Sequence, residues 1–61
     1  MTIRERIAEE TRGAKTRVDL DRIWHRDNKA FPRAIMAEFP GKFDEILYEW
    51  ENRKLTIGRE V

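Results

Sequence analysis

The chain has no cysteine and only one histidine among its 61 residues. Disulfide bonds are therefore excluded, and so is a structural zinc site built from cysteine and histidine. Serine is also absent, and we find no glycine-rich phosphate loop and no recognisable catalytic pair of carboxylates. A domain this short is not expected to enclose a substrate pocket of about 300 Å³ or more. We therefore expect a protein that is not an enzyme and that uses no metal and no cofactor.

Long apolar runs are missing as well, because charged residues make up 41% and apolar residues 39% of the chain. A membrane-spanning helix needs about 20 consecutive apolar residues. The N-terminal segment MTIRERIAEE lacks the apolar centre of a secretory signal. The apolar content is nevertheless too high for a disordered tail. We expect one cytoplasmic, water-soluble domain over residues 1–61, of modest stability, that self-association as a homodimer would reinforce.

Charge is distributed unevenly, although the net charge is only +1. Residues 11–33 carry seven basic and three acidic side chains, which gives this segment a net charge of +4. Residues 34–61 carry four basic and six acidic side chains, which gives them a net charge of −2. Such segregation indicates charged partners.

Helix signals occur at four places. Thr2 and Glu5 have the spacing of a capping box, which predicts a helix over residues 3–12. Apolar spacing predicts two short helices over residues 20–28 and 32–39, with a break before Pro32. The strongest periodicity, at i, i+3, i+4 and i+7, predicts a helix over residues 42–54 and is formed by Phe43, Ile46, Leu47 and Trp50.

The predicted fold is all-helical, a small bundle of three to four short helices followed by a tail. Residues 55–61 alternate between apolar and polar character, which predicts either an extended tail or an edge strand that adds to a partner. His25 and Asp21 are expected to pair on a helix surface rather than to bind a metal. The core is expected to contain the residues on the apolar helix faces: Ile7, Leu20, Ile23, Trp24, Phe31, Ile35, Met36, Phe39, Phe43, Ile46, Leu47 and Trp50.

Residues 33–52 place a small residue, Ala37, four positions before Gly41, and then Leu47 and Trp50 in the following helix. This arrangement resembles the helix-turn-helix motif of DNA-binding regulators. The resemblance implies a close helix crossing at Ala37, a turn at Gly41 and a second helix that faces the major groove. The residues then expected to reach DNA, in the basic segment 12–33 and the helix 42–54, are Lys15, Arg17, Arg22, Arg26, Arg33, Lys42, Asn52 and Arg53.

Two functions follow from these patterns. The first is a small regulatory protein, an accessory or phage-type inhibitor or adaptor, that docks on a larger protein through an acidic helix face formed by Asp44, Glu45, Tyr48 and Glu49. The second is a dimeric helix-turn-helix regulator that binds DNA. We favour the first, because carboxylates on the reading helix would repel the phosphates on which DNA affinity largely depends.

Overall fold

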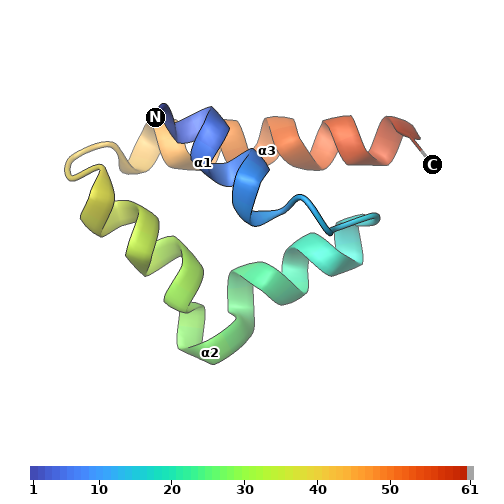
Figure 1. The fold of residues 1–61 in the computed structure, drawn as a ribbon, viewed down its shortest axis with the longest axis horizontal. Coiled ribbons are helices and arrows are strands. Elements are labelled where there is room, and N and C mark those ends of the chain that lie inside the picture. Colours follow the sequence, from blue (N-terminus) through green and yellow to red (C-terminus); the bar gives the residue numbers. More distant parts are fainter. Residues whose placement is uncertain (61) are drawn as a thin grey trace.

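The computed structural model describes the backbone of residues 1–60 and the side chains of residues 1–57. It contains three helices, α1 (Ile3–Glu10), α2 (Arg17–Glu38) and α3 (Phe43–Glu60), as Figure 1 shows. This part of the chain has no strand, so the predicted all-helical fold is confirmed. None of the helices described is both long and apolar enough to cross a membrane.

Two capping boxes fix the starts of α1 and α2. The hydroxyl of Thr2 accepts a hydrogen bond from the backbone N–H of Glu5 at 3.1 Å, and the Glu5 carboxylate accepts one from the N–H of Thr2 at 2.9 Å. The predicted start of a helix at residue 3 is therefore confirmed. Thr16 and Asp19 form the same reciprocal pair, which starts α2 at Arg17, earlier than the apolar spacing alone predicts.

These caps predict that stability depends on pH. Backbone N–H groups stabilise the carboxylates of Glu5 and Asp19, and this holds the pKa of each below its ordinary value. A lowered pKa in the folded state stabilises the fold above the ordinary pKa, and this contribution is lost as pH falls through the lower, folded-state value. We therefore expect the free energy of unfolding to decrease as pH is lowered below roughly 5.

The measurement is urea unfolding followed by circular dichroism between pH 7 and pH 2. The double variant Glu5→Gln, Asp19→Asn should flatten the pH dependence, whereas Glu9→Gln, an exposed carboxylate outside both capping boxes, should leave it unchanged. Parallel curves for the double variant and the wild type would show that the caps are not responsible.

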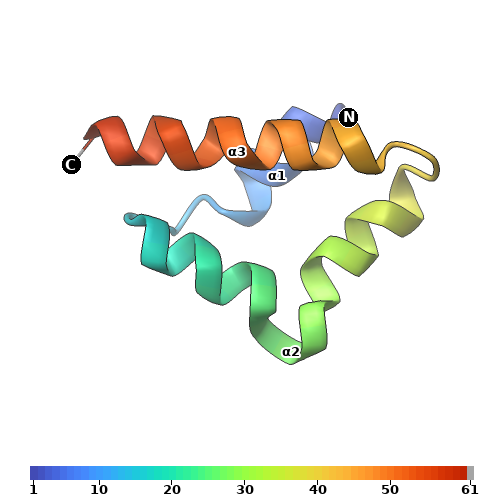
Figure 2. The ribbon, with the colours of Figure 1, turned by 180° about the vertical axis from the view of Figure 1, so that it is seen from behind.

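A sharp bend divides α2 into two arms, which form a V in Figure 2. The backbone leaves the helical region at residues 26–29, and Asp27, Asn28 and Lys29 have φ of 52°, 56° and 62°. Pro32 explains the bend, because within a continuous helix its ring would clash with the carbonyl group of residue 28. Pro32 instead lies buried in the first turn of the second arm, a position that suits proline. The predicted break is thus confirmed, but it lies at residues 26–29, slightly before the predicted position.

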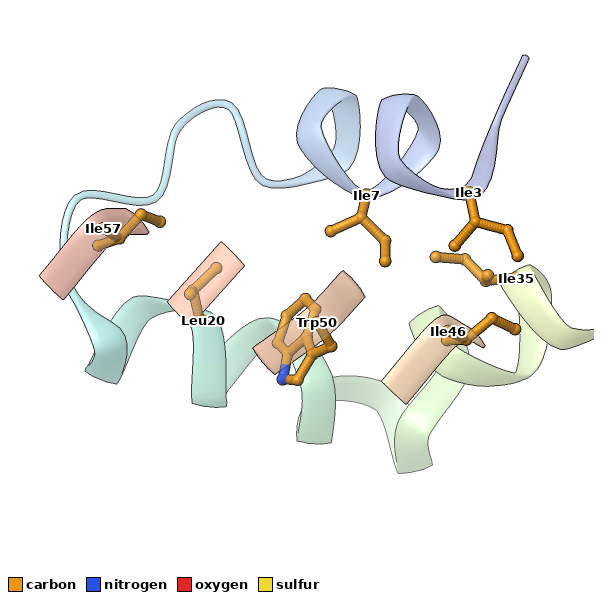
Figure 3. Packing of buried hydrophobic residues seen from close by; sticks show 7 residues of the cluster. All are labelled: Ile3, Ile7, Leu20, Ile35, Ile46, Trp50 and Ile57. Atoms are coloured by element: carbon orange, nitrogen blue, oxygen red, sulfur yellow. The ribbon is translucent and has the colours of Figure 1, made fainter. Parts of the chain in front are cut away.

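The core forms where α1 and α2 both pack on α3. Trp50 is its centre: its ring centroid lies 4.7 Å from that of Trp24 and 5.4 Å from that of Phe31. Aromatic side chains from both arms of α2 therefore meet one residue of α3. Figure 3 shows the buried core cluster of the described residues, formed by Ile3, Ile7, Leu20, Ile35, Ile46, Trp50 and Ile57.

Two predicted core residues lie outside this core. Phe43 is 48% exposed and Leu47 is 37% exposed, so their assignment to the core is wrong. The apolar stripe of α3 is wider than the surface that α1 and α2 cover, and residues at the edge of the stripe stay in solvent. Ile3 and Ile57, by contrast, are buried although the sequence analysis does not place them in the core.

The predicted extended tail is also wrong over the described residues, because α3 continues through Glu60. Ile57 lies seven residues after Trp50, on the same side of the helix, and is only 2% exposed. Its burial extends the packed side of α3 by two further turns. Val61, the last residue of the predicted tail, lies outside the described residues.

Polar contacts fasten α1 to both other helices. Arg4 Nε lies 3.1 Å from Glu49 Oε1 on α3, and Arg6 Nε lies 2.9 Å from Glu38 Oε2 on α2. Beyond the end of α1, the hydroxyl of Thr11 donates to the backbone oxygen of Ile7 at 2.7 Å and accepts from Arg53 Nε at 2.9 Å. Thr11 is fully buried, so this short network is the polar part of the interior.

Candidate binding surface

One side of α3 remains uncovered along its described length. Ile46, Trp50 and Ile57 face the core, and Glu49 and Arg53 bind partners from α1 and the residue that follows it. Four large apolar side chains of α3 stay in solvent: Phe43 at 48% exposure and Leu47 at 37% lie at the edge of the buried side, and Tyr48 at 63% and Leu55 at 52% lie on the opposite side. A concentration of this kind on one helix is typical of an interaction site.

Acidic residues share this side. Asp44, Tyr48, Glu51 and Leu55 follow one another at i, i+4, i+7 and i+11, which places them on one stripe of a helix with 3.6 residues per turn. Asp44 and Glu51 are exposed. We call the surface formed by Phe43, Asp44, Glu45, Leu47, Tyr48, Glu51 and Leu55 the outer face of α3.

The structure brings together three of the four residues predicted to bind a protein. Asp44, Glu45 and Tyr48 are exposed on the outer face of α3. Glu49 instead points to α1, where it binds Arg4, and its side chain is only 14% exposed. The hydrogen bond and charge of Glu49 raise the pKa of Arg4 above its ordinary value. Glu49 therefore serves the helix packing and does not belong to the open surface.

The apolar half of this surface was not predicted from the sequence. Phe43 and Leu47 were assigned to the core, and Leu55 was assigned to an extended tail. Phe43 and Leu47 share helical spacing with Ile46 and Trp50, which are buried, so this spacing does not distinguish them from core residues. A single sequence does not reveal which side of a wide apolar stripe finds a partner within the chain.

The helix-turn-helix geometry agrees with the structure only at the turn. Gly41 has φ of +77°, as a tight turn requires. Ala37 is exposed and so does not lie at a close helix crossing. Arg53 donates to the hydroxyl and the carbonyl oxygen of Thr11, at 2.9 and 3.4 Å, and is only partly exposed, as is Asn52. Of the three residues expected to reach DNA from residues 42–54, Lys42 alone is exposed.

The other residues predicted to contact DNA lie in the loop before α2 and on α2 itself. Lys15, Arg17, Arg22, Arg26 and Arg33 are all exposed. Arg17 Nε makes a long hydrogen bond of 3.4 Å to the backbone oxygen of Lys54. All five residues are therefore exposed and belong to the loop or to α2, but Arg17 also adjoins α3, where it shares a shallow hollow with Glu51 and Leu55.

A groove of about 450 Å³ runs between α1 and α3 and is open to solvent. This volume exceeds the one expected for so short a chain, because the groove forms between two helices and is not enclosed by the domain. The ion pair of Arg4 and Glu49 lines it, together with the part-buried Arg53. The charged groups that line the groove are thus already engaged in contacts between helices.

Within residues 1–57, no group of three or more histidine, aspartate or glutamate side chains is arranged to hold a metal ion. His25 and Asp21 are both exposed, and the ion pairs found in that part of the chain do not include them. The predicted pairing of these two residues is therefore wrong. Both side chains face solvent, where water competes for their polar groups.

Comparison with protein family models, with curated proteins and with solved structures finds no match to this chain.

Proposed function

We propose that this chain is a non-catalytic docking module that binds a larger protein through the outer face of α3. The observation that carries the proposal is the exposure of Phe43, Leu47, Tyr48 and Leu55 on one helix of a small domain. Aromatic residues dominate the energetics of protein interfaces, and a few of them commonly supply most of the affinity. The cost of leaving these side chains in water is offset when a partner covers them.

The chemistry of the outer face indicates the chemistry of the partner. Asp44, Glu45 and Glu51 surround the apolar side chains, and all three are exposed. A helix with this pattern fits a groove that has apolar walls and basic side chains at its rim. By occupying such a groove, the module would act as an inhibitor or adaptor of the larger protein. The same carboxylates disfavour insertion of α3 into a DNA groove.

Photocrosslinking tests where the partner binds. A photoreactive amino acid is placed at position 48 in one variant and at position 37 in the control, because Tyr48 and Ala37 are both exposed but lie on different helices. We expect the probe at position 48 to give a discrete crosslinked protein that excess wild-type chain competes away. Equal products from both positions would contradict the proposal.

The affinity of that complex then measures the role of single side chains. Phe43→Ala and Tyr48→Ala are each expected to weaken binding by at least about 10-fold, the range of an interface hot spot. Val18→Ala is the matched control, because Val18 is 58% exposed but lies on α2. If Val18→Ala weakened binding as much as Tyr48→Ala, the outer face of α3 would not be the binding surface.

A further inference from the structure

A second surface of the chain carries an excess of positive charge. Basic side chains extend from the loop before α2, along its first arm, over the bend and onto its second arm. All are exposed, and none of them is on α3. We call this surface the basic rim, which is formed by Arg12, Lys15, Arg22, Arg26, Lys29 and Arg33.

Three nearby carboxylates are engaged elsewhere in the described part of the chain, whereas Asp21 and Asp27 are exposed beside the basic side chains. Glu10 and Glu38 both bind Arg6. Asp19 caps α2 by accepting hydrogen bonds from the N–H groups of Lys15 and Thr16, at 3.0 and 3.3 Å. The only ion pair of the rim in this part of the chain joins Arg26 to Asp27 at 4.0 Å, with both side chains more than two thirds exposed. The rim is therefore a surface of weakly neutralised positive charge.

Two of its arginines lie close together. Arg22 and Arg26 line the same shallow hollow of about 300 Å³, beside Gly13 and Ala14 of the loop that follows α1. The planar guanidinium group presents several N–H donors in a geometry that matches phosphate oxygens. Glu10 and Asp19 also line this hollow, but Glu10 binds Arg6 and Asp19 accepts hydrogen bonds from the backbone N–H groups that it caps.

The bend in α2 gives the rim its extent. Arg22 belongs to the first arm, Lys29 lies at the bend and Arg33 belongs to the second arm. The two arms run in different directions (Figure 2), so these charges are not confined to one helix face. A charged polymer, which presents many phosphates in succession, matches such an array better than a single ion does.

An anionic membrane matches it less well, because peripheral membrane binding also uses exposed apolar side chains. Those are concentrated on α3, and Val18 is the one large apolar residue of α2 that is strongly exposed.

We infer that the basic rim binds the phosphate backbone of nucleic acid, without sequence preference, on a surface separate from the outer face of α3. Contacts to the backbone position a protein but carry no sequence information directly. This mode differs from that of a helix-turn-helix, because α3 stays outside the grooves. The chain would then hold a protein partner on one surface and a nucleic acid on the other.

The test is fluorescence anisotropy of a labelled random-sequence duplex, titrated with the full chain between 50 and 200 mM salt, a range over which phosphate contacts weaken binding strongly. The variant Arg22→Gln, Arg26→Gln is compared with Lys42→Gln, Lys54→Gln, which removes the same number of charges from α3 and the turn before it. Circular dichroism verifies that both variants are folded. We expect the arginine variant to weaken binding by about 10-fold at low salt and to reduce the slope of log K against log salt by about 2, close to 0.9 per phosphate contact.

Several results would overturn the inference. One is the absence of duplex binding at 50 mM salt. Another is an equal loss of duplex affinity in the two double variants, which would indicate general charge attraction. Binding to vesicles of anionic lipid with no binding to the duplex would assign the rim to a membrane. Tyr48→Ala separates this inference from the proposed protein docking: it should leave nucleic-acid binding unchanged, and a loss of binding would show that α3 contacts the nucleic acid.

Discussion

Replacing Trp50 by alanine is expected to leave most of the chain unfolded at 25 °C. The Trp50 ring is 4% exposed and contacts aromatic rings from both arms of α2. Truncating a buried tryptophan to alanine typically costs about 3–5 kcal/mol. A single core in a chain this short rarely supplies more than that amount. The substitution should therefore remove nearly all of the stability of the fold.

Far-UV circular dichroism and urea unfolding measure this loss. Tyr48→Ala is the control, since Tyr48 lies on the same helix but is 63% exposed, and it should change the free energy of unfolding by less than about 0.5 kcal/mol. Trp50→Phe keeps an aromatic ring, so its urea midpoint should lie between those of the wild type and Trp50→Ala. An unchanged urea midpoint for Trp50→Ala would mean that the three helices do not pack around this residue.

The substitution Thr11→Val is expected to destabilise the fold by about 1–3 kcal/mol, even though the two side chains have nearly the same shape. The Thr11 hydroxyl donates to the backbone oxygen of Ile7 and accepts from Arg53 Nε. Valine fills the same space without these bonds, and the part-buried guanidinium group of Arg53 then loses its best partner. Leaving such a donor unsatisfied costs more than the net gain from an ordinary hydrogen bond.

A double-mutant cycle identifies the cause. Arg53→Met removes the donor and keeps an unbranched side chain, so Thr11→Val should cost less in that background than in the wild type. The free energies of unfolding of the four proteins give the coupling energy between the two residues. Strictly additive effects would show that Thr11 acts through packing alone.

Local features of the fold were predictable because their causes lie within a few residues. Thr2 and Glu5 satisfy each other's backbone groups whatever the rest of the chain does, so the start of α1 follows from the sequence. Pro32 excludes a continuous helix by its covalent structure, so a break before it also follows. The spacing of Ile46 and Trp50 likewise predicts the buried side of α3.

Features that depend on distant contacts were not predictable in the same way. Ile57 belongs to a buried cluster with residues of α1 and α2, and a short alternating segment does not reveal these partners. Glu45 and Glu49 are both glutamates on the same predicted helix. Only Glu49 forms an ion pair with Arg4 of α1, which places it in the contact between the two helices. The acidic part of the candidate surface could thus be predicted, whereas its apolar part required the arrangement of the helices.

The order of the helices along the chain has a consequence for synthesis. Both α1 and α2 pack mainly on α3, which is the last of the three to leave the ribosome. Until α3 has emerged, Ile7, Leu20 and Ile35 have no surface that covers them, and the contacts of α1 must then close a loop of more than 30 residues. The nascent chain is therefore expected to stay open to proteases and chaperones during translation and to fold in one late step.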